Sequence, residues 1–343
     1  MKRTSVIFEK PYAVVLQTES FGEPAAGEVL VKTKFSAISP GSELLVYRGE
    51  FPPRLPVDGE IKALSEPFQY PIKYGYISVG EVVAVSSAVS KAWRDRPVFC
   101  FHPHESHYVA SLNDIIPIPE GIDPVEALFL PNTETAVNFI MDGRPVIGER
   151  AVIFGQGVVG LLTTALLAKF PLDKLVTLDR YEIRRRASMV MGAHDSLDPE
   201  SASLESDLAE LLKTDSAKGA ADLIYELSGN PEALNQAVAI AGFGARVVIG
   251  SWYGTKQARL NLGGQFHRSR IRLISSQVSS IAPEFSGRWT KNRRMETAWE
   301  MIRKIRPAQF ITHQFPVRRI REAYELLDKT PQKAIQVVIT YED

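Results

Sequence analysis

The chain is poor in cysteine and carries no excess of charge. Cys100 is the only cysteine among 343 residues, which excludes an internal disulfide and a cysteine-based zinc cluster. It lies in an apolar run, residues 97–101, where we expect a buried structural thiol. Forty basic and forty acidic residues give a formal net charge of zero. No overall field therefore attracts nucleic acid or an anionic membrane, and we expect neither as a partner.

Long apolar runs are also absent. No stretch approaches the roughly twenty apolar residues of a membrane span. Residues 1–16 have neither the apolar core nor the small-residue cleavage site of a signal peptide, so we expect a cytoplasmic protein. What the chain does have is 45% hydrophobic and 23% charged residues, a balance typical of a globular enzyme. Its length favours two domains.

The most informative segment is AVIFGQGVVG, residues 151–160. Its apolar start predicts a buried strand, its glycines have the spacing G-x-G-x-x-G, and a helical pattern follows over residues 161–170. Gly155 allows a tight turn, Gly157 lets the backbone approach a pyrophosphate, and Gly160 lets helix and strand pack closely. The helix N-terminus offers free N–H groups to phosphates. The segment predicts dinucleotide binding, with the cofactor-binding residues Gly155, Gln156, Gly157, Val158, Val159 and Gly160.

The acid that follows the second apolar run indicates which dinucleotide is bound. Asp179 ends the run LVTLD and is placed to accept hydrogen bonds from the adenosine ribose, which favours NAD over NADP. Arg180 is predicted to lie in the cofactor site as well. With Arg184, Arg185 and Arg186 it allows an alternative, in which the arginines hold the extra phosphate of NADP. Otherwise these arginines form the solvated face of a helix.

The rhythm of the predicted elements changes near residue 122. Before it, short apolar runs separated by Gly, Pro and Ser are typical of a barrel-like β module. After it, strands alternate with helices, which is typical of a parallel, doubly wound sheet. We expect an α/β protein with one domain of residues 1–122, completed by 282–343, and a nucleotide-binding domain of residues 123–281. The predicted strands are 5–9, 13–17, 28–35, 78–85, 98–101, 151–154, 175–179, 223–226, 246–250, 273–275 and 334–340, and further helices are predicted at 125–141, 293–305 and 319–329.

Several short motifs occur in one order and at regular intervals. They are EVLVKTKFSAIS from Glu28, Gly41-Ser42-Glu43 with Tyr47-Arg48-Gly49, GYISVGEVV from Gly75, Asp95-Arg96-Pro97-Val98, Gly148-Glu149-Arg150, and the stretch from His313 to Thr340. With them the chain resembles the medium-chain dehydrogenase/reductase superfamily, the zinc alcohol dehydrogenase-like proteins, over almost its full length. The resemblance implies a GroES-like β-barrel catalytic domain, a Rossmann domain, and a homodimer formed through the edge of the Rossmann sheet.

The family's zinc-ligand positions carry other residues here. The resemblance puts these positions at Pro40 or Ser39, at Tyr76 beside Ile77, and near Leu130. Zinc needs thiolate, imidazole or carboxylate ligands, and none of these side chains supplies one. The segment FHPHESHYVA offers a relocated site as an alternative to a polar loop or strand edge, built from His102, His104, Glu105 and His107. We favour the polar loop and predict no catalytic zinc.

Without zinc, hydrogen bonds or proton transfer must stabilise charge on the substrate oxygen. Ser42 lies where the family has a Ser or Thr that bonds the reacting oxygen, and a helix N-cap is the alternative role. Tyr76 replaces a ligand histidine, so its phenol could donate a proton to a carbonyl; a half-buried strand aromatic is the alternative. We expect Glu43 to pair with an arginine such as Arg48 rather than to take part in the chemistry.

The resemblance also assigns residues of the second domain. Glu134, in the segment PNTETA, lies where a helix of the family passes under the nicotinamide, and we expect it to be functional if it is buried. Ser228 and Gly229 lie where the family contacts the adenine-side ribose. Gly250 and Ser251 lie where backbone groups bind the nicotinamide amide.

We therefore predict a zinc-independent oxidoreductase that transfers hydride between NAD(H) and a secondary alcohol or ketone. Its substrate is expected to be a fairly bulky small molecule, because Trp252, Tyr253 and Phe266 would make the pocket partly aromatic. The segments ISPGSE and GYISVG are similar to the bacteriochlorophyllide dehydrogenase-like branch, which oxidises a hydroxyethyl group. One alternative is an NADPH-dependent enone or quinone (C=C) reductase. Another is a dinucleotide-binding sensor or structural protein without catalysis.

Overall fold

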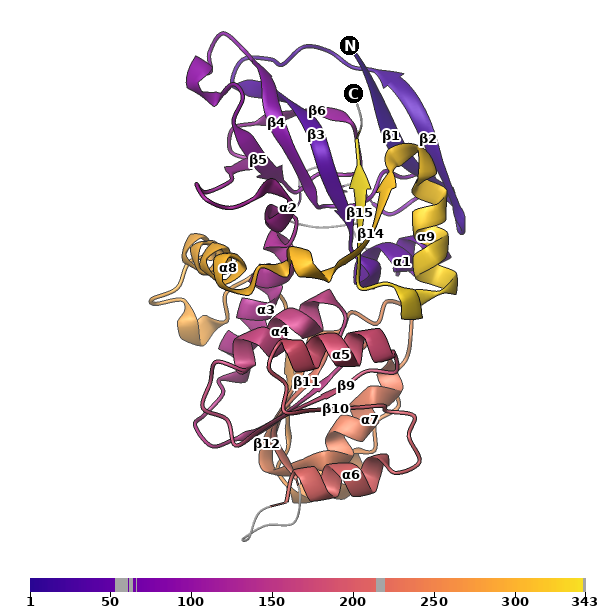
Figure 1. Ribbon diagram of the computed structural model, residues 1–343, viewed down its shortest axis with the longest axis vertical. Helices are drawn as coiled ribbons and strands as arrows, with labels where there is room; N and C mark the ends of the chain where they lie inside the picture. The colour runs from indigo at the N-terminus through magenta and orange to yellow at the C-terminus, as the bar shows by residue number, and fades with distance from the viewer. Residues whose placement is uncertain (53–60, 62–63, 66, 214–219, 342–343) are drawn as a thin grey trace. The chain divides into compact units, whose positions relative to one another are not determined.

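The computed structural model describes the chain except for residues 53–60, 62–63, 66, 214–219 and 342–343 (Figure 1). Its contacts divide the chain into two compact units. Unit 1 consists of Met1–Phe129 and Arg306–Asp343, and unit 2 consists of Leu130–Ile305. Unit 1 is mainly antiparallel β-structure and unit 2 is a parallel sheet with helices, which confirms the predicted fold class.

Unit 1 is built around its longest strand, β3. Residues Glu28–Ile38 form β3, and most of its residues are buried. It pairs with three strands, β4, β6 and β15. The sheet has the order β14-β15-β3-β4-β5-β7, and β1 and β2 form a separate hairpin. The bounds are β1 Lys2–Lys10, β2 Ala13–Ser20, β4 Ser78–Val85, β5 Pro97–Cys100, β6 His107–Ser111, β7 Ile115–Pro117, β14 Ile311–Pro316 and β15 Gln336–Thr340. The end of the chain thus completes the sheet of unit 1, as predicted.

The described part of unit 1 includes the α-helices α1 (Pro40–Arg48), α2 (Pro124–Ala127) and α9 (Ile320–Lys329). Aromatic rings join α1 and α9 to the hairpin in one apolar cluster. The ring of Tyr324 lies 5.2 Å from that of Phe8 and 5.4 Å from that of Tyr47, measured between centroids. Such aromatic pairs stabilise packing beyond the area that they bury. They hold the C-terminal end of α1, the helix whose first turn carries Ser42.

Unit 2 contains a six-stranded parallel sheet with the order β10-β9-β8-β11-β12-β13. Its strands are β8 Arg150–Phe154, β9 Lys174–Leu178, β10 Asp195–Leu197, β11 Ala221–Glu226, β12 Ala241–Ile249 and β13 Arg272–Ser275. Its helices are α3 Leu130–Gly143, α4 Val158–Leu167, α5 Glu182–Val190, α6 Leu204–Leu211, α7 Pro231–Ile240 and α8 Lys291–Ile305. The order reverses between β8 and β11, so the carboxyl ends of these two strands mark the switch point at which such sheets bind ligands.

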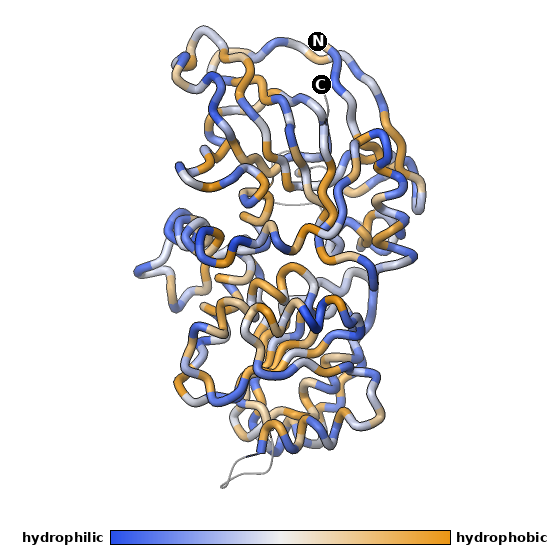
Figure 2. Tube along the Cα trace, in the orientation of Figure 1, coloured by the Kyte–Doolittle hydropathy of each residue, from blue (hydrophilic) through white to orange (hydrophobic). Residues whose placement is uncertain are grey.

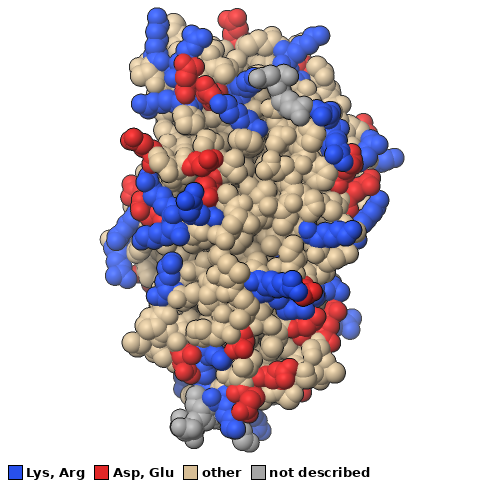
Figure 3. Space-filling model, viewed as in Figure 1, with Lys and Arg blue, Asp and Glu red and all other residues tan. Residues whose placement is uncertain are grey.

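The strands of this sheet are apolar because both of their faces are covered. Val152 of β8 belongs to one buried cluster and Ile153 to another, so alternate side chains serve two cores. Figure 2 shows the central strands of the sheet as largely hydrophobic. Basic and acidic side chains are interspersed on the face shown in Figure 3. In the described part of the chain, no helix has the length and hydrophobicity that crossing a bilayer requires.

Two predicted boundaries differ from the structure. The helix expected over residues 125–141 is two helices, α2 and α3, and Pro131 in the first turn of α3 lacks the N–H that a continuous helix would use. The units also divide at residues 129/130 and 305/306 instead of 122/123 and 281/282. The second unit ends at residue 305 and not at 281 because α8 packs on α3, where Arg294 of α8 forms an ion pair with Glu134.

Candidate active site

The glycine turn after β8 has the geometry that its sequence predicted. Gly155 has a φ of 91°, and a Cβ at this position would lie 2.6 Å from the carbonyl oxygen of Leu227. A Cβ at Gly160 would lie 2.0 Å from the carbonyl oxygen of Gly155. Only glycine fits either position, because the turn packs directly against backbone. Val158 and Val159 are the first two residues of α4.

The N-terminus of α4 is open toward the carboxyl edge of the sheet. Gly157 is the N-cap residue and gives no side-chain cap, and a Cβ built there would meet nothing within 4 Å. Gln156 is fully buried, and its side-chain amide donates to the carbonyl oxygen of Gly155 over 3.1 Å. The first turn of α4 therefore begins beside a rigid turn, with open space at Gly157 and no side-chain cap, a geometry that fits a phosphate of a dinucleotide.

Asp179 lies at the same edge, directly after β9, and is 6% exposed. One carboxylate oxygen accepts the backbone N–H of Gln156 over 2.8 Å, and the other accepts that of Tyr181 over 2.8 Å. A carboxylate has about four acceptor positions, so two bonds leave capacity for ribose hydroxyls. The backbone thus holds Asp179 in place beside the glycine turn.

The arginines that follow Asp179 are engaged by other groups. Arg184 is the nearest to its carboxylate, with 3.9 Å between Nη1 and Oδ2. The others form ion pairs along α5 and the loop after β10: Arg180 with Glu200, Arg185 with Asp198, and Arg186 with Glu182. These pairs fit the interpretation of a solvated helix face better than a ready-made phosphate site.

Four predicted cofactor-binding residues lie around Glu226, at the ends of β11 and β12. They are Ser228, Gly229, Gly250 and Ser251. The carboxylate of Glu226 accepts hydrogen bonds from the backbone N–H and the hydroxyl of Ser228. The N–H groups of Gly250 and Ser251 donate to the carbonyl oxygen of Glu226, and Ser251 Oγ accepts the N–H of Gly229 over 2.9 Å. Together with Gly155 and Asp179, these residues line the carboxyl edge of strands β8, β9, β11 and β12.

In unit 1, three hydroxyl groups meet at the start of α1. The phenol of Tyr76, in the segment before β4, donates to Ser39 Oγ over 2.5 Å. Ser42 Oγ lies 3.3 Å from the same phenol oxygen. Ser39 is the N-cap residue of α1, so Ser42 lies in the first turn and is not the N-cap. Tyr76 is half-buried and precedes the strand instead of lying in it.

A buried acid, Glu43, holds one member of this hydroxyl cluster in place. Glu43 is fully buried, and its Oε1 accepts the backbone N–H of Ser39 over 2.8 Å. Its Oε2 accepts the phenol of Tyr324 over 2.5 Å and lies 3.0 Å from Nε2 of His104. The other ring nitrogen of His104 is 2.7 Å from Ser36 Oγ. The expectation that Glu43 pairs with Arg48 is therefore wrong, because Arg48 pairs with Asp328 on α9.

Comparison with known proteins shows similarity to dehydrogenases. A family model described as "Zinc-binding dehydrogenase" matches residues 158–295. The starvation-sensing protein RspB of Escherichia coli K12 is 24% identical, with 99% of each chain covered, and the D-guloside 3-dehydrogenase of the same organism is 23% identical, with 92% and 93% covered. The 2-desacetyl-2-hydroxyethyl bacteriochlorophyllide A dehydrogenase of Cereibacter sphaeroides is 26% identical, with 94% of each covered. A solved structure of RspB from Escherichia coli CFT073, complexed with NADH, has a TM-score of 0.79 at 19% identity and 99% coverage of each chain.

These matches support the medium-chain dehydrogenase/reductase superfamily for this chain. The chain is an oxidoreductase, as its dehydrogenase relatives indicate, and unit 1 and unit 2 have the GroES-like and Rossmann folds. The matching family model lies wholly within unit 2, so the model itself carries no information about zinc ligands in unit 1.

The residues at the expected zinc positions of this dehydrogenase do not fit zinc. Ser39 and Tyr76 present hydroxyl groups that bond each other, and Leu130 is an apolar, fully buried residue at the start of α3. Zinc sites in proteins are built from thiolate, imidazole and carboxylate ligands. Over the described ranges, no group of three or more His, Cys, Asp and Glu side chains could hold a metal ion.

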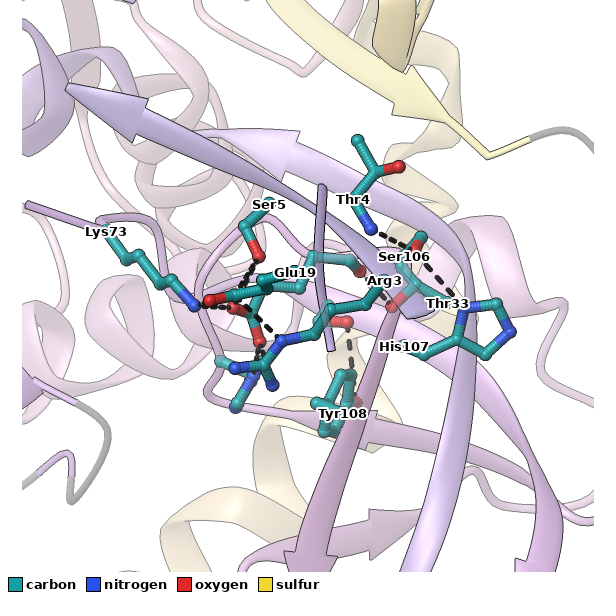
Figure 4. A network of polar contacts seen from close by, with 12 residues as sticks. Arg3, Thr4, Ser5, Glu19, Thr33, Lys73, Ser106, His107 and Tyr108 are labelled. Atoms are coloured by element: carbon teal, nitrogen blue, oxygen red, sulfur yellow. Dashed lines mark hydrogen bonds and ion pairs between the residues drawn. The ribbon is translucent and has the colours of Figure 1, made fainter. Parts of the chain in front are cut away.

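The residues of the alternative metal site are used elsewhere. Glu105 is almost fully buried in an ion network, with Lys73 Nζ at 2.6 Å, Arg3 Nη1 at 3.1 Å and His102 Nε2 at 2.9 Å. Figure 4 shows Arg3 and Lys73 converging from two segments of unit 1, together with Glu19 and Ser5. His104 belongs to the Glu43 cluster instead, and His107 lies 3.1 Å from Ser106 Oγ. His104 is also fully buried, in the loop that precedes β6.

Glu134 is buried, which was the condition for a functional role, but it forms an ion pair with Arg294. Its Oε1 accepts Nε of Arg294 over 3.0 Å, and Arg294 is itself 1% exposed. Arg294 also donates to Asn138 and to the carbonyl oxygens of Val278 and Ser280. The pair joins α3 to α8 and gives Glu134 a structural role, while its catalytic role stays a prediction.

The expected aromatic lining is only partly available. Phe266 packs against the apolar core of unit 2, and the phenol of Tyr253 donates to Glu226. Trp252 is 42% exposed.

Sequence analysis missed Glu226 and Tyr324. A signal for Glu226 existed, because LIYE ends a buried strand with an acid just as LVTLD does. Tyr324 gave no signal, because 281 residues separate it from Glu43.

Proposed function

We propose that this dehydrogenase transfers hydride between NAD(H) and a secondary alcohol or ketone without a catalytic zinc. The observation that carries the proposal is that unit 2 has an edge suited to a dinucleotide, while unit 1 has a hydroxyl cluster at positions where the resemblance puts the family's zinc ligands. The nicotinamide supplies or accepts the hydride when it is bound. The remaining requirement is a group of the protein that handles the proton of the substrate oxygen.

NAD is preferred in this proposal because of the surroundings of Asp179. The extra phosphate of NADP would lie against a nearly buried carboxylate, which repels it. Arg180, Arg185 and Arg186 would have to leave their acidic partners to compensate. Binding of the NADP phosphate would therefore break existing ion pairs, whereas the ribose hydroxyls of NAD would only add hydrogen bonds to Asp179.

The hydroxyl cluster provides the proton chemistry. In ketone reduction, Tyr76 Oη turns its proton from Ser39 Oγ to the substrate oxygen, and Ser42 Oγ donates a second hydrogen bond to that oxygen. Ser39 Oγ, 2.5 Å from the phenol oxygen, then donates to the resulting phenolate, which regains a proton from solvent. Ser39 is itself held by Glu43, because the buried carboxylate binds its backbone N–H. The named relatives include dehydrogenases of a guloside and of a hydroxyethyl group on a pigment, which supports a ring-bearing, fairly bulky substrate.

The first test is a fluorescence titration of the purified protein with NADH and NADPH, with metal analysis of the same sample. We expect tighter binding of NADH and substoichiometric zinc. A screen of bulky secondary alcohols follows, in which activity should survive EDTA and fall at least about tenfold in Tyr76→Phe. One zinc per chain with activity lost on chelation would refute zinc independence. Preference for NADPH would redirect the screen to enones and quinones, and tight NADH binding without any turnover would favour a sensor.

A further inference from the structure

The proposed chemistry leaves one buried acid at the cofactor edge without a role. Glu226 is fully buried at the carboxyl end of β11, next to β8 at the switch point of the sheet. Its carboxylate accepts three hydrogen bonds, two from Ser228 and one from the phenol of Tyr253 over 2.5 Å. Burying a carboxylate is costly unless hydrogen bonds satisfy it. Such an acid holds its donors firmly in place.

Tyr253 belongs to the segment that follows β12, residues 251–256. The turn from Tyr253 to Lys256 is closed by a backbone hydrogen bond of 3.1 Å, with Gly254 at a φ of 62°. The segment contacts the turn after β11 at two more points: Ser251 Oγ accepts the N–H of Gly229, and Lys256 Nζ donates to the carbonyl oxygen of Gly229 over 3.2 Å. Burial and the nearby Glu226 carboxylate raise the pKa of Tyr253, so its phenol keeps its proton and acts as a donor.

The position of this segment connects it with one half of the cofactor. A doubly wound sheet consists of two mononucleotide-binding halves. Asp179 and the glycine turn lie on the half formed by β8, β9 and β10, where the adenosine side binds. Segment 251–256 leaves β12, so it lies on the other half, formed by β11, β12 and β13, where the nicotinamide side binds.

We propose that the Tyr253–Glu226 hydrogen bond is a clasp that holds segment 251–256 in the conformation that binds the nicotinamide half of the cofactor. The proposal rests on the proposed function. Tyr253 and Glu226 are positioning residues in it: they act through the backbone of Gly250 and Ser251, and they touch no reacting atom. The clasp is specific to one half of the dinucleotide, which makes it testable without knowledge of the substrate.

The test compares NADH with ADP-ribose, which lacks the nicotinamide, in the wild type and in Tyr253→Phe. NADH binding is followed by nicotinamide fluorescence, and ADP-ribose binding by calorimetry. We expect Tyr253→Phe to weaken NADH binding by roughly tenfold, as for the loss of one hydrogen bond to a charged group, and to change ADP-ribose binding less than about twofold. The emission of bound NADH should also shift toward that of the free cofactor.

Tyr225→Phe is the matched control. Tyr225 precedes Glu226 on β11 and is fully buried, but its hydroxyl has no hydrogen-bond partner among the described residues. Its removal should leave both ligands unaffected. Glu226→Gln provides a second variant, should Tyr253→Phe not fold. Because Glu226 also accepts two hydrogen bonds from Ser228, its substitution removes more than the clasp, and adding Tyr253→Phe to it should weaken NADH binding no further.

Equal weakening of NADH and ADP-ribose by Tyr253→Phe, or unchanged NADH affinity, would overturn the clasp. Failure of the wild type to bind NADH would instead overturn the proposed function. The two failures are therefore distinct.

Discussion

Individual side chains in this dehydrogenase are defined by what already binds them. Asp179, Glu226 and Glu43 are all nearly or fully buried carboxylates, yet their partners differ in kind. Asp179 accepts the backbone N–H groups of Gln156 in the glycine turn and of Tyr181, which leaves acceptor positions for a ligand. Glu43 is instead engaged by Ser39, Tyr324 and His104. The remaining acceptor capacity of Asp179 is the reason for its proposed role in cofactor selection.

Asp179→Asn should reverse the cofactor preference. The amide keeps one acceptor for the backbone but loses the charge that repels a 2′-phosphate. We expect NADH binding to weaken by roughly tenfold and NADPH binding to weaken less or improve. Fluorescence titration of both cofactors measures the ratio. Glu205→Gln, at an exposed acid of α6, is the control, and a ratio that stays at the wild-type value in Asp179→Asn would show that another group selects the cofactor.

At the scale of elements, buried polar contacts decide which helix belongs to which unit. α8 lies near the end of the Rossmann half of the sequence, and its helical pattern alone fits either domain. Arg294 determines its place, because a fully buried guanidinium must meet acceptors, and Glu134 and Asn138 of α3 provide them. The same pair explains why a buried acid in the segment PNTETA need not be catalytic.

Glu134→Gln should lower stability much more than cofactor affinity. The substitution leaves the Arg294 charge buried without its counter-ion, at a cost of about 3 kcal/mol in the free energy of unfolding. Chemical denaturation measures this loss, and NADH titration should give an unchanged dissociation constant. The matched control is Glu296→Gln, an exposed carboxylate on α8. A catalytic Glu134 would give the opposite result: near wild-type stability with turnover lost.

At the scale of the whole molecule, equal numbers of basic and acidic residues give no net charge at neutral pH. We therefore expect the free energy of unfolding at low pH to depend on individual buried carboxylates. Glu105 is the clearest of these, since it joins β1, the segment before β4 and the loop before β6. Burial alone raises its pKa, but the hydrogen bonds and charges of His102 and Lys73 outweigh burial and lower the pKa to about 2.

This lowered pKa predicts a pH window. A carboxyl whose pKa is lower in the folded than in the unfolded state stabilises the fold above the unfolded pKa, near 4.5, and that stability is lost as the pH falls toward 2. The wild type should lose up to about 3 kcal/mol in this window relative to Glu105→Gln. Denaturation at several pH values measures the difference, with the exposed Glu9→Gln as control. Parallel pH profiles for the wild type and Glu105→Gln would contradict the role of Glu105.

The sequence by itself determined the local and periodic features of this protein. The strand, glycine turn, helix and acid from residue 151 to Asp179 could be predicted because each depends on residues near in the chain. The alternation of strands and helices in unit 2, and the strand near residue 340 that completes unit 1, followed from apolar periodicity. The absence of zinc-type side chains at the expected ligand positions was also evident from the sequence.

Only the tertiary structure decided which polar groups meet. Glu43 with His104 and Tyr324, Glu134 with Arg294, and Glu226 with Tyr253 join residues that are 27 to 281 positions apart in the chain. Composition and spacing cannot predict such pairs, because burial forces each charged or polar group to find whichever partner the packing brings to it. For this reason the cofactor edge could be anticipated, whereas the supports of the hydroxyl cluster and of segment 251–256 could not.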